Sequence, residues 1–410
     1  MVLFEGRVMK CLRWFAAATA LCVGLSPSAH AAPHETLKLD APKPRLALTP
    51  PMGWNSWNKF GCNVSEQLIR EQADAMVASG MKAAGYNTLV IDDCWQKSRD
   101  GEGRIQPDPD RFPSGMKALA DYVHSRGLKF GLYSDAGVLT CGGRPGSAGH
   151  EFQDARQYAA WGVDWLKYDW CYTGPRNPEA AYTLMAKALR ESGRDIVLSI
   201  CEWGSSQPGK WAGSIGHLWR TTGDIWDAWK GKKEWSHGLL DIIDMNADLW
   251  ADAGPNAWND PDMLEVGNGG MTTTEYESHF SLWAMLAAPL IAGNDLRQMD
   301  ADTKRILMNA EVIRVDQDPL GRQGRRVWRQ GDLEVWVRVL AGGERAAVLF
   351  NRGEAPADMK VTWEQLDLAP RLKAEVLDLW SGKKTRGVVG EVGGRVAPHG
   401  VIMVRVTPTP

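Results

Sequence analysis

Short apolar runs with the character of β-strands alternate with amphipathic, helix-like stretches along most of this chain. Eight such runs occur within about 270 residues, and repeated strand–helix units on that scale are typical of a (β/α)8 TIM barrel with eight parallel strands. The runs are Met52–Trp57, Asn87–Asp93, Lys129–Asp135, Val163–Asp169, Asp195–Trp203, His217–Asp224, Ala257–Met263 and Leu290–Asp295. A doubly wound open sheet is the alternative. It usually has fewer repeats and a glycine-rich phosphate loop, and Gly101-Glu-Gly103 lacks the third glycine of such a loop.

Helical periodicity is clearest in three segments between these runs, at Ser65–Ala84, Met116–Arg126 and Pro178–Ser192. Ser65 is well placed to cap the first of these helices, because its hydroxyl can accept from a free backbone N–H of the first turn. The sequence therefore predicts that strands alternate with helices up to about residue 322.

From Gln323 onward helical periodicity is scarce. The sequence there predicts short strands, with alternating apolar and polar residues, separated by glycine-rich turns. The expected strands are Val327–Trp328, Leu333–Val339, Ala346–Phe350, Met359–Val361, Ala374–Leu379 and Val401–Val406. This pattern predicts a C-terminal antiparallel β-sandwich domain, which would either stabilise the barrel or act as a weak sugar-binding module. We expect a signal peptide over residues 1–31, a leader over 32–43, the catalytic barrel over 44–322 and the β domain over 323–410.

The N-terminus has the features of an export signal. Lys10 and Arg13 form a basic region, Phe15–Leu25 is an apolar stretch too short to span a bilayer, and Ala29-His30-Ala31 has the form of a cleavage site. No later apolar run is long enough to cross a membrane. The sequence thus predicts an exported protein, either periplasmic or secreted.

Composition and the absence of several motifs exclude some classes of function. The formal net charge of −3 supplies no basic face for nucleic acid. The eight histidines form no HxH or HExxH group, and Gly204–Gly209 lacks the spacing of a serine-hydrolase elbow, so we expect no metal, no cofactor and no serine nucleophile. The 20 tryptophans stand out. Although many will lie in the core, an indole face suits the apolar face of a sugar ring, and the total favours a carbohydrate-active protein.

Acidic residues follow at least six of the predicted strands. They are Asp92 and Asp93, Asp135, Asp169, Glu202, Asp224, and Asp260 with Asp262. In a barrel enzyme the C-terminal strand ends form the active-site face, so these carboxylates would line one pocket. Capping of the next helix or turn is the alternative, which suits Asp135 better than Asp169 or Glu202, because no helix start follows the latter two.

Two of these carboxylates share a strand face with a basic residue. Because side chains alternate along a strand, Lys167 and Asp169 point to the same interior face, where two charges are costly unless they pair or have a role. A nearby ammonium helps to keep a carboxylate ionised, which suits a nucleophile, although a structural Lys–Asp pair is the alternative. Asp224, two strands further around, lies on one face with Arg220 and supplies the second carboxylate that a glycosidase needs.

Five cysteines remain after the predicted signal peptide. Four of them fall in loops that follow the first four strands, and pairing Cys62 with Cys94 and Cys141 with Cys171 would join neighbouring loops at the pocket rim. Cys201 lies in an apolar strand and is expected to be a free, buried thiol.

Six ordered motifs resemble glycoside hydrolase family 27, the α-galactosidase or melibiase family. They are Met52-Gly-Trp-Asn-Ser-Trp57, Ile91-Asp-Asp-Cys-Trp95, Lys167-Tyr-Asp-Trp-Cys171, Cys201-Glu-Trp-Gly204, Trp219-Arg-Thr-Thr-Gly-Asp224 and Asn259-Asp-Pro-Asp-Met263. The resemblance covers about Leu48 to Arg322, and the family also carries a trailing β domain. It implies a retaining exo-glycosidase that removes terminal α-D-galactosyl residues from oligosaccharides or polysaccharide side chains through a covalent glycosyl-aspartate.

The resemblance also implies residue roles. Asp169 corresponds to the nucleophile and Asp224 to the acid/base. The residues implied to hold the terminal sugar are Trp54, Asp92, Asp93, Tyr133, Lys167, Glu202, Trp203, Arg220 and Asp262. Within this set, Asp92 and Asp93 are similar to the pair that binds the galactose hydroxyls at positions 4 and 6, and Glu202 with Trp203 is similar to the galactose rather than the N-acetylgalactosamine type.

The chain departs from the family at Trp170, where Asn is usual, and over Gly204–Lys210. A β-L-arabinopyranosidase or another variant of the same family is therefore the alternative activity. A catalytically inactive sugar-binding protein is a further alternative, but such proteins usually lack one catalytic carboxylate, and both Asp169 and Asp224 are present.

Overall fold

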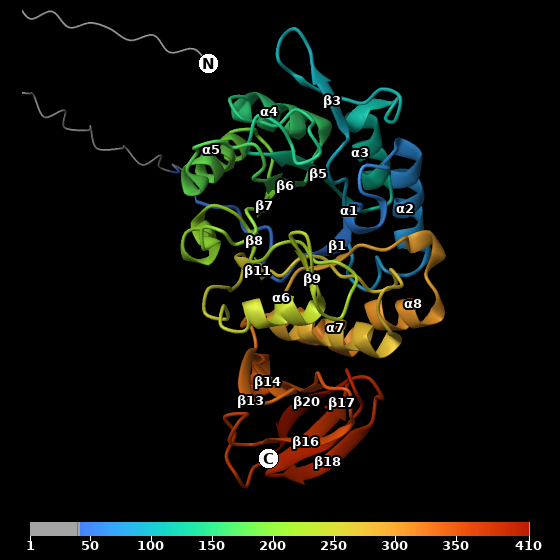
Figure 1. The fold of residues 1–410 in the computed structure, drawn as a ribbon, viewed down its shortest axis with the longest axis vertical. Coiled ribbons are helices and arrows are strands. Elements are labelled where there is room, and N and C mark those ends of the chain that lie inside the picture. Colours follow the sequence, from blue (N-terminus) through green and yellow to red (C-terminus); the bar gives the residue numbers. More distant parts are fainter. Residues whose placement is uncertain (1–38, 40–41, 410) are drawn as a thin grey trace, which may run out of the picture. The chain divides into compact units, whose positions relative to one another are not determined.

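The computed structural model describes Leu39 and residues 42–409. All eight predicted runs contain a strand, and the eight strands form one parallel sheet (Figure 1). These strands are β1 (Met52–Asn55), β2 (Thr88–Val90), β5 (Lys129–Asp135), β6 (Trp165–Asp169), β7 (Val197–Ile200), β8 (Leu218–Arg220), β11 (Trp258–Asp260) and β12 (Leu290–Ala292). The predicted signal peptide lies outside the described residues.

The sheet closes on itself. Its hydrogen-bonded order is β11-β8-β7-β6-β5-β2-β1-β12, and a parallel bridge between Leu264, just after β11, and Ala292 of β12 joins the two ends. The N–H of Leu264 donates to the carbonyl of Ile291 at 2.8 Å, and the carbonyl of Leu264 accepts from the N–H of Gly293 at 3.1 Å. The barrel prediction is therefore confirmed, and the open doubly wound sheet is excluded.

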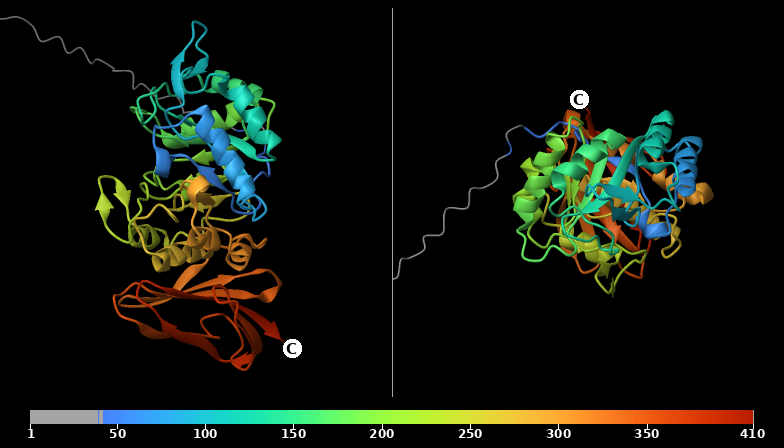
Figure 2. Two further views of the ribbon diagram at one scale, coloured as in Figure 1. Left: turned by 90° about the vertical axis from the view of Figure 1, so that its right-hand side faces the viewer. Right: turned by 90° about the horizontal axis from the view of Figure 1, so that it is seen from above.

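Helices lie around the strands, as the view from above shows (Figure 2). They are α1 (Trp57–Phe60), α2 (Glu66–Ala78), α3 (Gly115–Ser125), α4 (Glu151–Trp161), α5 (Pro178–Arg190), α6 (Leu239–Asn246), α7 (Thr273–Leu286), α8 (Ala301–Leu307) and α9 (Ala310–Asp316). The Ser65 side chain accepts from the N–H of Leu68, which confirms the predicted cap. Helix α2 ends at Ala78, earlier than the predicted Ala84, because the chain turns after Ser79.

Two hairpins on the loops were not predicted from the sequence. The first is β3 (Gln96–Arg99) with β4 (Ile105–Pro107), and the second is β9 (Lys232–Lys233) with β10 (Ser236–His237). Both are short and polar, so they lack the alternating apolar pattern that marks a strand. The second hairpin follows β8 and stands next to the site described below.

The C-terminal region is antiparallel, as predicted. A six-stranded sheet has the order β13-β14-β15-β20-β17-β18, and β16 pairs with β19 in a second sheet. The strands are β13 (Arg325–Gln330), β14 (Leu333–Val339), β15 (Arg345–Asn351), β16 (Ala357–Thr362), β17 (Lys373–Asp378), β18 (Lys384–Val389), β19 (Glu391–Val396) and β20 (Val401–Thr409). The sequence did not predict β18 and β19, because most of their side chains are exposed and they contain few apolar residues.

Helix α7 of the barrel packs against strands β14, β15 and β20 of this β domain. Nearly all of its side chains are buried, which is expected of a helix covered on all sides. The guanidinium of Arg338 on β14 is buried at this junction and donates to the carbonyls of Ala284 and Asp316. Ser281 on α7 accepts from the indole N–H of Trp380 at 2.9 Å. The β domain is thus packed on the barrel through buried polar contacts as well as apolar ones.

We expect the Arg338→Ala variant to be less stable than the wild type by about 3 kcal/mol, because two buried carbonyls and the buried Asp316 carboxyl lose their cationic neighbour. Thermal or denaturant unfolding measures this change. Arg395→Ala is the control, since this arginine is 64% exposed and pairs with an exposed Asp358, and it should leave stability unchanged. Equal stability of the two variants would contradict the role of Arg338.

Candidate active site

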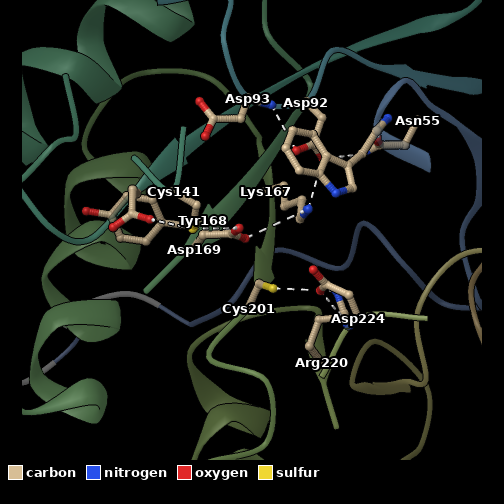
Figure 3. A network of polar contacts seen from close by, with 12 residues as sticks. Asn55, Asp92, Asp93, Cys141, Lys167, Tyr168, Asp169, Cys201, Arg220 and Asp224 are labelled. Carbon is tan, nitrogen blue, oxygen red and sulfur yellow. Dashed lines mark hydrogen bonds and ion pairs between the residues drawn. The ribbon is translucent and has the colours of Figure 1, made fainter. Parts of the chain in front are cut away.

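The charged residues at the strand ends converge because the strands run parallel and in register. In the ladder between β5 and β6, Tyr133 lies beside Lys167 and Asp135 beside Asp169, and between β8 and β11 Arg220 lies beside Asp260. Figure 3 shows carboxylates and two cations from several strands gathered in one place. The prediction that acids at the strand ends meet at one face is confirmed.

These side chains surround a pocket of about 650 Å³. Its lining residues are Trp57, Asp92, Asp93, Tyr133, Cys141, Gly142, Lys167, Asp169, Cys171, Tyr172, Trp203, Gly223, Asp224 and Trp235. Of the residues implied by the resemblance, seven line the pocket directly. Arg220, the last residue of β8, is buried next to it, as are Glu202 and Asp262 in the loops after β7 and β11.

Lys167 lies between two carboxylates (Figure 3). Its ammonium is 2.9 Å from Oδ2 of Asp92 and 3.9 Å from Oδ1 of Asp169. The amide of Asn55 also donates to Oδ2 of Asp92, at 2.7 Å. Although burial opposes its charge, the carboxylates of Asp169 and Asp92 raise the pKa of Lys167 well above its ordinary value. Lys167 is therefore charged, and its shorter contact is with Asp92.

Asp169 has an unused acceptor. Its Oδ1 is buried without a hydrogen-bond partner among the described residues, and Sγ of Cys141 lies 3.8 Å from Oδ2. Burial raises the pKa of Asp169 to about 7, and the nearby Lys167 ammonium partly offsets that rise. Since an unpaired buried acceptor is costly, it marks a group that a ligand would contact.

Arg220 forms a second cation between carboxylates. Its Nη2 lies 3.0 Å from Oδ1 of Asp224 and 2.8 Å from Oδ2 of Asp262. Burial opposes ionisation of Asp224, but Arg220 and then Lys167 lower its pKa below the ordinary value. Burial raises the pKa of Asp262 to about 6 despite Arg220. The side chain of Asp224 is 25% exposed, whereas that of Asp169 is 8% exposed.

Other polar groups at the site keep free hydrogen-bonding capacity. Asp93 accepts from the N–H groups of Cys94 and Gly142, both at 2.6 Å. Glu202 accepts from Ser206 N–H at 2.6 Å through Oε2, while its Oε1 is buried and unpartnered among the described residues. The buried hydroxyl of Tyr133 likewise has no partner there. Such an array suits a ligand rich in hydroxyl groups.

Both predicted disulfides are present. Cys62–Cys94 joins the loops after β1 and β2, and Cys141–Cys171 joins the loops after β5 and β6. Cys201 is a buried free thiol, as predicted. Asp135 lies close to Cys141 and Cys171, but sulfurs in a disulfide offer no thiolate, so this cluster is a poor metal site.

Trp54 does not belong to the pocket, which corrects the prediction for this residue. Its side chain is fully buried, donates from the indole N–H to the carbonyl of Asn294 at 2.7 Å and packs against Phe60. Strand alternation gives the reason, since Asn55 points into the barrel and Trp54 therefore points outward. The pocket is instead lined by Trp57, three residues later in the same motif.

The departure at Trp170 also lies away from the pocket lining. Its ring stacks on Tyr182, with centroids 5.5 Å apart and an interplanar angle of 25°. Three lining aromatics were missed by sequence reasoning: Trp57, Tyr172 and Trp235. The rule that site residues follow the barrel strands could have found Trp57, which comes two residues after the end of β1. Tyr172 and Trp235 lie in loops whose position depends on distant contacts.

Known proteins resemble most of this chain. A family described as "Alpha galactosidase A" matches residues 49–318, and one described as "Alpha galactosidase C-terminal beta sandwich domain" matches residues 330–406. The chain is 50% identical over 378 residues to an α-galactosidase A of Cellvibrio japonicus, and the match covers 89% of this chain and 93% of that protein.

Solved structures of α-galactosidases have a similar fold. The fold is similar to that of α-galactosidase I from Mortierella vinacea, with a TM-score of 0.86 and 40% identity, covering 88% of this chain and 97% of that one. A GH27 β-L-arabinopyranosidase from Geobacillus stearothermophilus is a more distant neighbour, with a TM-score of 0.79 and 27% identity, covering 88% and 97% of the two chains.

The Asp169→Asn variant should be more stable than the wild type at high pH. The pKa of Asp169 is about 7 in the folded protein and about 3.9 when unfolded, so the folded state loses stability as pH rises through that range. An asparagine at position 169 cannot ionise, so the variant does not lose this stability as pH rises. We expect a gain of the order of 2 kcal/mol at pH 8 and little difference at pH 4, measured by denaturant unfolding.

Asp358→Asn is the matched control, because this carboxylate is 79% exposed, and it should change stability at neither pH. A variant at position 169 that is less stable than wild type at pH 8 would show that the Asp169 carboxylate is a structural partner of Lys167 and not a destabilising group.

Proposed function

Because the chain belongs to glycoside hydrolase family 27, the α-galactosidases, it is a glycoside hydrolase that removes terminal α-galactosyl groups, and we propose that Asp169 and Asp224 are its catalytic carboxylates. The observation that carries this proposal is the buried, unpartnered Oδ1 of Asp169 beside the Lys167 ammonium, in the same pocket as Asp224. A nucleophile must present such a free oxygen to the sugar.

The reaction proceeds in two displacements. In the first, a carboxylate oxygen of Asp169 bonds to the anomeric carbon while the glycosidic C–O bond breaks, and Asp224 gives its proton to the leaving oxygen. This leaves a β-linked galactosyl ester on Asp169 and a free aglycone. In the second, Asp224 takes a proton from water, the water oxygen attacks the anomeric carbon from the opposite face, and Asp169 leaves as a carboxylate. The product therefore retains the α configuration.

Depth in the pocket supports this division of roles. Asp169 is the more buried of the two side chains and has Lys167 beside it, which helps to keep it ionised. Asp224 is more exposed, where a leaving group can depart toward solvent. With the roles assigned this way, the sugar ring occupies the floor of the pocket and the aglycone leaves past Asp224.

The proton must still reach Asp224 before the first step. The pKa of Asp169 is raised to about 7 by burial and that of Asp224 is lowered by Arg220, so without substrate a single shared proton rests mainly on Asp169. A bound galactosyl group excludes water from Asp224, which raises its pKa, and the positive charge that develops on the sugar favours ionised Asp169. The productive form is therefore the singly protonated pair.

The remaining polar residues hold the galactosyl group. Asp92 and Asp93 are vicinal acceptors for two hydroxyls, and analogues lacking a hydroxyl would leave a buried carboxylate unpaired. This pairing favours galactose over β-L-arabinopyranose, which lacks the C6 hydroxymethyl. The free Oε1 of Glu202 and the hydroxyl of Tyr133 offer further contacts, and Trp203 narrows the pocket. The set is completed by Trp57, Lys167, Arg220 and Asp262.

We further propose that the protein is exported and acts on galactose-containing oligosaccharides or polysaccharide side chains. Two disulfides require an oxidising compartment and so support export. None of the described helices has the length and apolar character that a bilayer crossing requires. We place the domain boundary between Arg322 and Gln323, just before β13 begins at Arg325.

Removal of either carboxylate should have a distinct signature. We expect Asp169→Gly to lower kcat/KM for nitrophenyl α-galactoside about ten-thousandfold, and added azide should then give β-galactosyl azide, because it enters from the face that Asp169 occupied. Asp224→Gly with azide should give α-galactosyl azide, because azide replaces water in the second step. Proton NMR of the azides identifies both products.

An exposed carboxylate provides the control, and Asp358→Asn should retain full activity without azide. Exchange of the two azide anomers between the Asp169 and Asp224 variants would reverse the assigned roles. Full activity of both glycine variants would exclude this pair from catalysis.

The pH dependence of kcat/KM should be bell-shaped with an acidic optimum. Activity is expected to fall at pH values above about 7, because the pair then loses its only proton. It is also expected to fall at pH values below the ordinary pKa of aspartate, because the pair then gains a second proton. Initial rates between about pH 3 and pH 9 measure the profile. Activity that still rises at the alkaline end would contradict a shared proton with a pKa near 7.

A further inference from the structure

Two of the exposed large apolar side chains of the described residues lie at the mouth of the catalytic pocket. Trp235 is 67% exposed and Tyr172 is 58% exposed, and both line the pocket. An indole exposed to this degree beside a polar cavity leaves a flat apolar face with nothing packed on it. Neither residue belongs to the polar set that holds the galactosyl group.

Trp235 is held beside the proposed acid. It lies with Glu234 in the two-residue loop of the β9–β10 hairpin, and Glu234 has a φ of +55°, a left-handed conformation that is costly for a residue with a side chain. The N–H of His237 donates to the carbonyl of Asp224 at 2.7 Å. The hairpin is thus hydrogen-bonded directly to the backbone of Asp224.

The loop tip also packs closely on the residue before the acid. A Cβ atom at Gly223 would lie 2.5 Å from the carbonyl oxygen of Trp235, so only glycine permits this approach. The base of the hairpin is fixed as well, since Gly231 accepts from Gly238 at 2.7 Å and donates to Asp241 at 2.7 Å. The exposed indole therefore projects from a tightly anchored turn.

Tyr172 comes from a different strand end. It directly follows Cys171, which is bonded to Cys141, and it has a left-handed φ of +48°. Its carbonyl accepts from the N–H of Val138, whose side chain is 65% exposed. Strained backbone conformations tend to cluster at functional sites. Strand β7 separates the strands that lead to Tyr172 and Trp235, so the two rings come from different parts of the rim.

We propose that Trp235 and Tyr172 form a binding site for the sugar residue to which the terminal galactose is attached. The proposal rests on the proposed role of Asp224, since the glycosidic oxygen must lie at the acid when the bond breaks. The next sugar ring then emerges beside Gly223 and Trp235. The C–H face of a pyranose is apolar and flat, and an indole ring is the side chain that matches it. The preferred substrates are therefore oligosaccharides with a pyranose aglycone.

Two substrates separate this site from the galactosyl pocket. An α-1,6-galactosyl disaccharide has a sugar aglycone, whereas methyl α-galactoside has a methoxy leaving group that needs the same proton from Asp224 but is too small to reach Trp235. We expect Trp235→Ala to lower kcat/KM for the disaccharide roughly tenfold and to leave kcat/KM for the methyl galactoside within about twofold of wild type. Trp235→Phe should restore most of the loss, because it keeps a flat apolar ring.

Trp250→Ala is the matched control, because this tryptophan is 45% exposed and lies outside the pocket lining, and it should alter neither rate. Equal losses on both substrates would mean that the hairpin only positions Asp224, and no loss on the disaccharide would mean that nothing stacks on Trp235. Either result overturns the inference while the proposed function stands. A wild-type protein inactive on both substrates would remove the proposed function itself.

Discussion

The Lys167 ammonium, held inside the barrel between Asp92 and Asp169, is the interaction on which the rest of the site depends. A buried cation is tolerated only where nearby carboxylates offset the free energy of its lost hydration. Buried carboxylates are tolerated near a cation for the same reason. Arg220 repeats this arrangement two strands away, between Asp224 and Asp262. Each proposed catalytic carboxylate thus lies near its own cation, and each cation is shared with a second carboxylate that holds it in place.

This arrangement requires a rigid frame. Charges from separate strands can be held a few ångströms apart only if the strands themselves cannot shift, and a closed ring of parallel strands provides that restraint. The two disulfides extend it to the loops after β1, β2, β5 and β6. The β9–β10 hairpin, which is hydrogen-bonded to the backbone of Asp224, restrains the loop after β8 in the same way. The polar floor and the aromatic rim of the pocket are therefore positioned by the same strand ends, and together they underlie the proposed preference for a galactosyl group with a sugar attached.

Much of the fold could be predicted from the sequence, because burial fixes the pattern of apolar residues. All eight barrel strands were found this way, as were most strands of the β domain. The exposed β18 and β19 were missed because their sequences carry no such pattern. Within the site, alternation correctly placed Lys167 and Asp169 on one face, and the rule that site residues follow the barrel strands would have preferred Trp57, which comes after β1, to Trp54 inside it. The place of Trp235 could not be predicted, since it depends on a hydrogen bond between His237 and Asp224. The pKa order of the two carboxylates likewise depends on how deeply each is buried and on how close each lies to a cation, and spacing in the sequence gives neither.

The central claim is that Asp169 forms the covalent bond to the sugar. Trapping that bond tests it most directly, with 5-fluoro-α-galactosyl fluoride, whose ring fluorine slows release of the enzyme-bound sugar. Peptide mapping by mass spectrometry should then find a single fluorogalactosyl ester, on Asp169 and lost on treatment with mild base. An ester on Asp224 or on another carboxylate, or turnover to a product of inverted configuration with no adduct, would contradict the account.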